Sequence, residues 1–237
     1  MAHFLLVHGS NHGAWCWRDV VPELEARGHT ATALDLPSHG ADKTPIAEVT
    51  LDAYADKILA ALDGPTILVG HSAGGYAITQ AAERDPTNVA GLVFLTAYVP
   101  QPGKSLVDML GEAPEQPMKG AFDMAPDKKS FRFKPEFLTR ALYGDCPDGT
   151  YDYAMAHIGW QPLSTQTVPP PLTGASDTVP RRYIFCTEDR AIPLAHQKQM
   201  AAGFSADETF DLATGHSPFF SAPGPLADIL DRIANAT

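Results

Sequence analysis

A serine lies where an apolar run meets a helical pattern, in the sequence LVGHSAGGYA (68–77). Residues 70–74 read Gly-His-Ser-Ala-Gly, and a helical pattern continues from Ser72 to about Arg84. Such a turn exposes the serine hydroxyl at the end of a strand, and its glycines avoid collisions inside the turn. A glycine-rich turn with an incidental serine is the simpler alternative. The flanking strand and amphipathic helix favour a nucleophile, so the sequence predicts a catalytic role for Ser72.

A serine nucleophile needs a general base, and histidine is the usual one. Of the nine histidines, only His157, His196 and His216 follow Ser72 by more than one turn. His216 comes directly after the predicted strand 208–212, which brings it to the sheet edge where Ser72 lies. His196 falls within a helical pattern, and His157 falls within a proline-rich segment. We therefore predict that His216 is the base.

The base needs a carboxylate that orients it, and this group is also expected at the end of a strand. The predicted strand 181–187 ends in CTEDRAIP, which offers Glu188 and Asp189. We predict that Asp189, with the shorter side chain, is the catalytic acid, and that Glu188 is solvated. A second position for the acid, after the preceding strand, holds Thr96, Ala97 and Tyr98 and no carboxylate.

Attack by the serine creates an oxyanion, which two backbone N–H groups would stabilise. The Ala73 N–H, directly after the nucleophile, is the first predicted donor. The second is the Ser10 N–H, in the loop HGSNHGAW after the first predicted strand, where Gly9 permits a tight turn. His8 and His12 in this loop are spaced like a metal-binding pair on a helix. They flank a glycine turn without a third ligand nearby, so we predict no metal site.

Short apolar runs alternate with helical patterns along the chain. Predicted strands cover residues 3–8, 30–36, 65–70, 89–99, 181–187 and 208–212. Helical patterns separate them, and one of these covers residues 50–62. The alternation predicts an α/β fold with about six mostly parallel strands and helices on both faces. Residues 100–180 hold 12 of the 21 prolines. We predict that residues 101–180 form an inserted cap of short helices and loops, and that residues 1–100 and 181–237 form the core.

The chain carries a formal net charge of −11, from 17 basic and 28 acidic residues among 237. This charge disfavours nucleic acid and anionic membranes as partners and favours a neutral small molecule. Cys16, Cys146 and Cys186 form no CxxC motif, which favours reduced thiols in a cytoplasmic protein. The N-terminal residues lack the basic start of a signal peptide. No apolar stretch approaches membrane-spanning length. An exposed edge strand would allow a homodimer, which the sequence leaves open.

These motifs together resemble the α/β-hydrolase superfamily and, within it, the plant methylesterase and hydroxynitrile lyase family. The resemblance covers most of the chain, in the segments LLVHGSNHGAWCW, GHTATALDLPSHG, ILVGHSAGG, YIFCTEDRAIP and TGHS, with FLTRALYGDCP in the cap. It implies an α/β-hydrolase fold and a serine hydrolase that cleaves small methyl, aryl or alkyl esters through an acyl-enzyme. No cofactor is implied.

Three positions separate the esterases of this family from its lyases. The lyases carry a threonine-bearing turn after the first strand, a lysine after the catalytic histidine and a glutamate before the serine. This chain has His8-Gly9, Ser217 and His71 there, which favours the esterase. Ser72 disfavours the relatives with an aspartate nucleophile. Hydrolysis of lactones, thioesters or C–C bonds, lyase activity, and a small-molecule receptor without turnover are the alternatives.

The substrate pocket is expected between the sheet edge and the cap. Trp160 is the first candidate for its lining, followed by Tyr98 and Phe122, with Tyr143 and Phe219 as further candidates. Aromatic residues at such positions are also typical of core packing. A neutral aromatic lining would suit a small aryl or alkyl ester.

Overall fold

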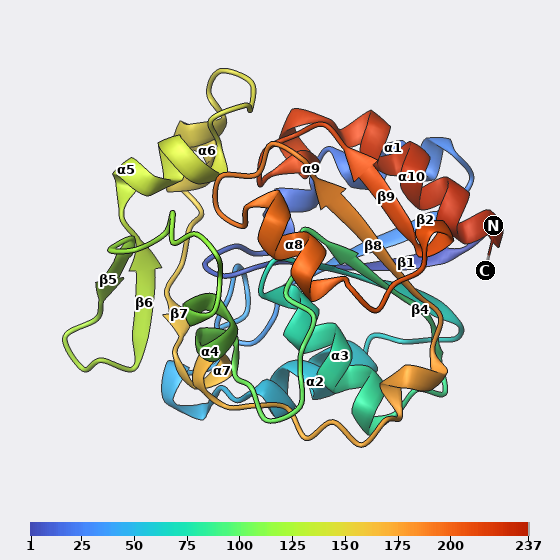
Figure 1. Ribbon diagram of the computed structural model, residues 1–237, viewed down its shortest axis with the longest axis horizontal. Coiled ribbons are helices and arrows are strands. Elements are labelled where there is room, and N and C mark those ends of the chain that lie inside the picture. The colour runs from blue at the N-terminus through green and yellow to red at the C-terminus, as the bar shows by residue number, and fades with distance from the viewer. Residues whose placement is uncertain (237) are drawn as a thin grey trace.

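Six parallel strands form the central sheet of the computed structural model, which describes residues 1–236 (Figure 1). They run in the order β2-β1-β3-β4-β8-β9. The strands are β1 (His3–Val7), β2 (Thr30–Leu34), β3 (Thr66–His71), β4 (Val89–Leu95), β8 (Arg181–Cys186) and β9 (Thr209–Leu212). The predicted α/β fold with about six mostly parallel strands is confirmed. Because all neighbouring strands are parallel, their carboxyl ends share one edge of the sheet.

Helices cover both faces of the sheet, and the alternation along β1 shows why. Phe4 and Leu6 face the apolar cluster that includes residues of α1 and α10, whereas Leu5 and Val7 face the cluster that includes α2 and α3. Figure 1 shows these two layers on opposite sides of the strands. The core helices are α1 (Val20–Ala26), α2 (Leu51–Leu59), α3 (Gly74–Arg84), α8 (Leu194–Met200), α9 (Pro218–Ser221) and α10 (Pro223–Ala236), with short 3-10 turns at Ala14–Trp17, Ile46–Glu48 and Ala206–Glu208.

Two element boundaries differ from the sequence prediction for local reasons. The strand expected over residues 89–99 ends at Leu95, because Thr96 adopts a left-handed backbone conformation with φ 39°. The helix expected over 50–62 ends at Leu59 and begins after Thr50, whose side chain accepts a hydrogen bond from the Ala53 N–H at 3.1 Å.

The segment predicted as a cap contains a small sheet that the sequence analysis did not expect. Its order is β5-β6-β7, and both pairs are antiparallel. The rings of Phe122, Phe131 and Phe133 pack on one another with centroid separations of 5.1 to 6.1 Å, which stabilises the hairpin. The elements are α4 (Leu106–Gly111), β5 (Phe122–Met124), β6 (Ser130–Phe133), α5 (Pro135–Phe137), a π-helical turn (Leu138–Leu142), α6 (Thr150–Met155), β7 (Gln161–Pro162), α7 (Ser164–Thr167) and a 3-10 turn (Ser176–Thr178).

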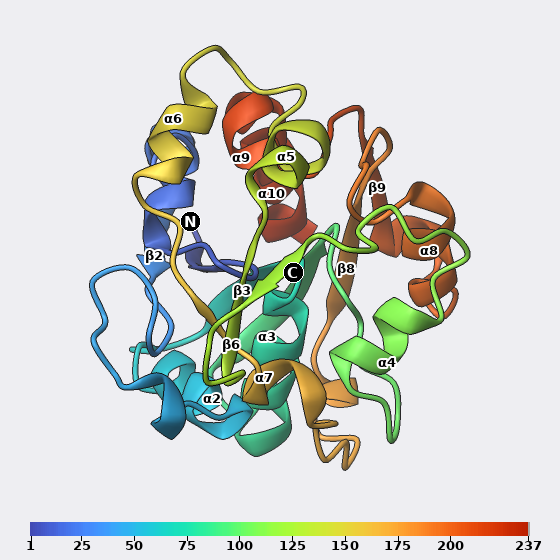
Figure 2. The same cartoon turned by 90° about the vertical axis from the view of Figure 1, so that its left-hand side faces the viewer.

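Helices α4 to α7 and strands β5 to β7 of the segment predicted as a cap lie at the end of the sheet where the strands terminate (Figures 1 and 2). The chain that returns from this segment is fastened to the core by Glu83, near the end of α3. This carboxylate accepts four hydrogen bonds from the N–H and hydroxyl groups of Thr173 and Ser176. Within residues 1–236, no helix has the length and apolar character needed to cross a membrane.

Candidate active site

Ser72 lies in the turn between β3 and α3, with a left-handed backbone conformation of φ 53°. Two close approaches explain the glycines on either side. A Cβ at Gly70 would lie 2.8 Å from backbone atoms of Gly74, and a Cβ at Gly74 would lie 2.8 Å from the carbonyl oxygen of His8. Both separations are shorter than a Cβ tolerates, so the sharp turn that presents Ser72 requires glycine at these positions.

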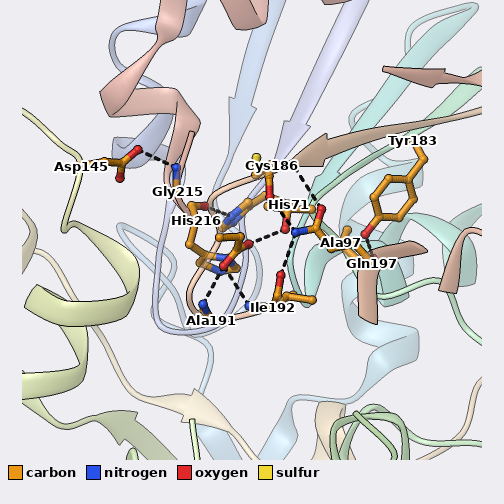
Figure 3. Close-up of polar contacts among 12 residues, drawn as sticks. His71, Ala97, Asp145, Tyr183, Cys186, Ala191, Ile192, Gln197, Gly215 and His216 are labelled. Atoms are coloured by element: carbon orange, nitrogen blue, oxygen red, sulfur yellow. Dashed lines mark hydrogen bonds and ion pairs between the residues drawn. The ribbon is translucent and has the colours of Figure 1, made fainter. Parts of the chain in front are cut away.

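His216 and Asp189 come from the loops that follow β9 and β8, and their side chains are hydrogen-bonded. His216 Nδ1 donates to Asp189 Oδ2 at 2.7 Å. The other carboxylate oxygen accepts the N–H groups of Ala191 at 2.7 Å and Ile192 at 2.9 Å, residues shown in Figure 3. Because Nδ1 carries the proton in this bond, Nε2 of a neutral His216 is free to accept one.

Two residues that the sequence analysis did not assign to the site hold Asp189 in place. The Thr96 hydroxyl donates to Asp189 Oδ2 at 2.5 Å. Gln197 on α8 brackets the acid loop: its Nε2 donates to the carbonyl oxygens of Cys186 at 2.9 Å and Ile192 at 2.7 Å, and its Oε1 accepts the Cys186 N–H. Thr96 occupies the second acid position noted in the sequence, which was the only signal for it. No local pattern pointed to Gln197.

The residues not chosen as base or acid in the sequence analysis, His157, His196 and Glu188, lie outside the cavity that contains Ser72. His157 is exposed and donates through Nδ1 to the carbonyl oxygen of Tyr153 at 2.7 Å. His196 on α8 packs edge-on against the ring of Tyr98. Glu188 borders a small surface pocket with Arg140 and Arg190. None of the three lines the cavity that contains Ser72 and His216.

The two predicted oxyanion donors, Ser10 and Ala73, line the same cavity as Ser72. Neither backbone N–H donates to another group within residues 1–236. The Ser10 N–H belongs to the Gly9–Ser10 peptide group. A hydrogen bond of 2.8 Å from His8 Nδ1 to the carbonyl oxygen of this group, that of Gly9, orients it. The Ser10 N–H therefore points away from the ring of His8.

The two histidines of this loop are neutral and hydrogen-bonded on both ring nitrogens. His8 Nε2 accepts the Leu36 N–H, while His12 Nδ1 donates to the Ser10 carbonyl oxygen at 2.8 Å and its Nε2 accepts from the Tyr143 hydroxyl at 2.7 Å. Burial lowers the pKa of His8 to about 4 and that of His12 to about 3. Among residues 1–236, no cluster of three or more His, Cys, Asp or Glu side chains could hold a metal ion.

A cavity of about 210 Å³ opens in front of Ser72 and His216. Its remaining wall is mainly apolar, and it includes two of the predicted lining residues, Tyr98 and Phe122. Trp160, the first candidate, does not border this cavity; the Arg132 guanidinium lies over its ring at 4.9 Å from the centroid. The two further candidates also lie outside the cavity wall; they are Tyr143, bonded to His12, and Phe219, packed against His71.

Residues 4–229 match the family described as the alpha/beta hydrolase family. The match covers most of the chain, and the protein therefore belongs to this family. The expected membership of the α/β-hydrolase superfamily is confirmed.

Relatives similar in sequence and structure indicate which kind of hydrolase the protein is. Methylesterase 7 of Arabidopsis thaliana is 33% identical over 249 residues, which cover 98% of this chain and 96% of the relative. The pyrethroid hydrolase of Sphingobium wenxiniae is 33% identical over 247 residues, covering 98% and 87%. The crystal structure of polyneuridine aldehyde esterase superposes with a TM-score of 0.86 at 27% identity, covering 99% of both chains. The resemblance to plant methylesterases is confirmed, and the protein is a hydrolase of the carboxylesterase type.

Proposed function

We propose that this protein is a serine esterase that hydrolyses small, neutral carboxylic esters with an apolar body. The observation that carries the proposal is the cavity wall, which includes Ser72, His216, Ser10 and Ala73 beside mainly apolar side chains. The names of the relatives, methylesterase and pyrethroid hydrolase, support ester hydrolysis. A cytoplasmic location, favoured by the three free cysteines, is part of the same proposal.

In the first step, Ser72 Oγ attacks the ester carbonyl carbon and its proton passes to His216 Nε2. The hydrogen bond from His216 Nδ1 to Asp189 fixes the tautomer that accepts this proton. Asp189 also stabilises the imidazolium that forms, and four hydrogen bonds hold its carboxylate in place.

The tetrahedral intermediate places a negative charge on the former carbonyl oxygen. The N–H groups of Ser10 and Ala73 would donate to it, each contributing on the order of 3 kcal/mol to the transition state. The intermediate then collapses, and the alcohol leaves with the proton from His216. Water attacks the acyl-enzyme by the same route in reverse, with His216 taking its proton, and releases the acid.

The lining of the cavity indicates the chemical class of the substrate. Leu106 and Leu110 of α4 and Phe122, Phe131 and Phe133 of the cap hairpin supply much of it. No Lys, Arg, Asp or Glu of the described residues borders the cavity. A charge buried against such a wall would have no partner, which is costly, so we expect uncharged acyl and alcohol groups.

The first experiment compares wild type with Ser72→Ala on short-chain p-nitrophenyl esters and methyl esters of aryl acids. We expect kcat/KM to fall by several orders of magnitude, on the order of 10⁶-fold for complete loss of the nucleophile. Ser205→Ala is the matched control, because its hydroxyl caps the 206–208 turn and does not border the cavity. Activity that survives in Ser72→Ala would refute the proposed nucleophile.

A second series tests the substrate class. The same alcohol is esterified with an alkanoic acid and with a dicarboxylic acid of similar length, which leaves one free carboxylate. We expect kcat/KM for the charged ester to be lower by about 100-fold or more, because its carboxylate loses water without gaining a partner. Equal rates would contradict a site that selects neutral esters.

A further inference from the structure

Asn11 follows Ser10 in the loop after β1 and is fully buried. Its backbone has φ 65°, in the left-handed region that asparagine tolerates better than most residues. The predicted mechanism uses the neighbouring Ser10 N–H but assigns nothing to Asn11. Its hydrogen bonds nevertheless all reach into the cap.

Four hydrogen bonds join Asn11 to the cap. The side-chain Nδ2 donates to the carbonyl oxygens of Phe131 on β6 and Gly159 before β7, both at 2.9 Å. The backbone carbonyl oxygen accepts the Gly159 N–H at 3.0 Å. The backbone N–H donates to Gln161 Oε1 at 3.2 Å. Because both side-chain contacts are carbonyl oxygens, the orientation of the Asn11 amide is determined.

Gln161 on β7 is itself held in one orientation. Its Nε2 donates to the hydroxyl oxygens of Thr165 at 2.9 Å and Tyr54 at 3.2 Å. The amide oxygen of this fully buried side chain therefore faces the Asn11 N–H, and rotation of the amide would break these bonds.

The peptide group between Ser10 and Asn11 is held by hydrogen bonds at both its carbonyl oxygen and its N–H. Its carbonyl oxygen, from Ser10, accepts from His12 Nδ1, and its N–H, from Asn11, donates to Gln161. A flip of this peptide would break both hydrogen bonds at once. Since Ser10 lies between this peptide and the one held by His8, its backbone can turn little about φ and ψ.

We propose that Asn11 is a positioning residue through which the cap holds the Ser10 N–H in place for the oxyanion. The inference rests on the proposed function, because it assumes that Ser10 is a donor. Its consequence is that the Ser10 half of the oxyanion hole depends on the hydrogen bonds of Asn11 with residues 131, 159 and 161, all in the inserted segment. Substrate binding depends instead on the apolar wall, where the Phe131 ring is held by packing against Phe122 and Phe133.

The test compares two ligands that differ in the negative charge they place at the oxyanion. A trifluoromethyl ketone analogue of the best ester adds to Ser72 Oγ as a hemiketal oxyanion, with the serine proton passing to His216. The parent methyl ketone binds the same cavity largely without this addition. Their Ki values are measured for wild type, Ser72→Ala, Asn11→Gly and Gln161→Met, together with kcat, KM and Tm. Glycine accommodates φ 65° without strain, so Asn11→Gly removes the side chain alone.

We expect Asn11→Gly to lower kcat, and to raise the Ki of the trifluoromethyl ketone, by about 10- to 100-fold. This effect is smaller than that of removing an oxyanion donor completely. KM and the Ki of the methyl ketone should change by no more than about twofold. Gln161→Met should act in the same direction and provides the test if Asn11→Gly does not fold. Glu83→Ala is the matched control, since it removes four hydrogen bonds to Thr173 and Ser176, remote from the cavity. It should lower Tm and leave kcat unchanged.

Two outcomes separate the possible failures. If Asn11→Gly and Gln161→Met lower Tm as Glu83→Ala does and leave the preference for the trifluoromethyl ketone intact, Asn11 has only a structural role and the inference is overturned. If wild type binds the trifluoromethyl ketone no better than Ser72→Ala does, the proposed function itself fails, whatever the Asn11 variants show.

Discussion

His71 Nε2 donates to the backbone carbonyl oxygen of His216 at 2.8 Å, and the two rings lie 4.7 Å apart (Figure 3). The last residue of β3 therefore holds the loop that presents the predicted catalytic base. Burial, together with the nearby rings of His216 and His12, lowers the pKa of His71 well below its usual range. The ring is neutral, with its proton on the nitrogen that faces His216, so this contact persists across the working pH range.

The first prediction concerns this contact. His71→Phe keeps the packing of the ring against Phe219 but removes the donor, so the His216 loop gains freedom. We expect kcat to fall about 10-fold with little change in KM, the loss of roughly one hydrogen bond. His157→Phe removes the same kind of ring-to-carbonyl bond far from the cavity and should leave kcat unchanged. Equal kcat for wild type and His71→Phe would show that the contact is dispensable.

The choice between Asp189 and Glu188 as the acid gives the second prediction. In Asp189→Asn, the side-chain amide can donate a hydrogen bond to His216 Nδ1, which favours the histidine tautomer with its proton on Nε2. This tautomer cannot accept the serine proton, so kcat should fall by about 10⁴-fold. Glu188→Gln should change kcat by less than about twofold, because this side chain does not border the cavity. Steady-state kinetics on one ester compares kcat for the two variants. A larger loss of kcat in Glu188→Gln than in Asp189→Asn would assign the role of the acid to Glu188.

Thr96 carries the third prediction, through the hydrogen bond from its hydroxyl to Asp189 Oδ2. Thr96→Val keeps the branched shape and removes this donor, which should lower the free energy of unfolding by about 1.5–3 kcal/mol. Because Asp189 then has one restraint fewer, kcat should also fall, by about 10-fold. Thr96→Ser retains the hydroxyl and should recover most of the kcat. If serine performs no better than valine, the hydroxyl is not what matters.

The fourth prediction is a loss of stability in mild acid. In the unfolded chain, His8 and His12 bind protons as the pH falls through about 6.5, whereas in the folded protein their pKa values are about 4 and about 3. The unfolded state therefore holds more protons between pH 6.5 and 4, so stability falls as the pH is lowered through this window. Each such histidine contributes about 1.4 kcal/mol per pH unit below about pH 6.

Urea unfolding at pH 7.5, 6.0 and 5.0 measures this slope. Glu83, whose burial is outweighed by hydrogen bonds from Ser176 and Thr173, has its pKa lowered to about 2. Its unfolded form takes up a proton mainly below about pH 5, so Glu83 adds little to the change in stability between pH 7.5 and 5.0. His39, which burial also keeps neutral, offers a variant: His39→Gln should make the slope shallower by about one histidine. A free energy of unfolding that is flat from pH 7.5 to 5.0 would contradict the prediction.

The residues that could be predicted from sequence are those that follow strands. Ser72, Asp189 and His216 each lie a few residues at most beyond the end of a strand, and parallel strands bring such positions to one edge. The structure brings their side chains to one place, while their catalytic roles remain predictions to be tested by the variants above. The inner strands β1, β3, β4 and β8 were predictable because their burial on both faces leaves nearly continuous apolar runs.

Thr96 and Asn11 could not be predicted as supporting residues, because each acts over a long separation in sequence. Thr96 contacts a residue 93 positions away, and Asn11 contacts residues 120 and 148 positions away. No local pattern encodes such pairs. The cap hairpin was missed because strands of three and four residues are too short to show an alternation. The position of Trp160 outside this cavity could not be predicted, because the type of an aromatic residue in a loop does not indicate which side its ring faces.

The apolar wall of the cavity also bears on what happens after the reaction. A neutral ester is converted into a carboxylic acid, which is ionised near pH 7. The new carboxylate lies in a cavity to which the described residues contribute no Lys or Arg, so it is stabilised better by water outside. Hydrolysis thus converts a neutral ligand that binds the apolar wall into an anion that binds it weakly. Product release is favoured by the chemistry itself, and turnover should continue with little inhibition by accumulated acid.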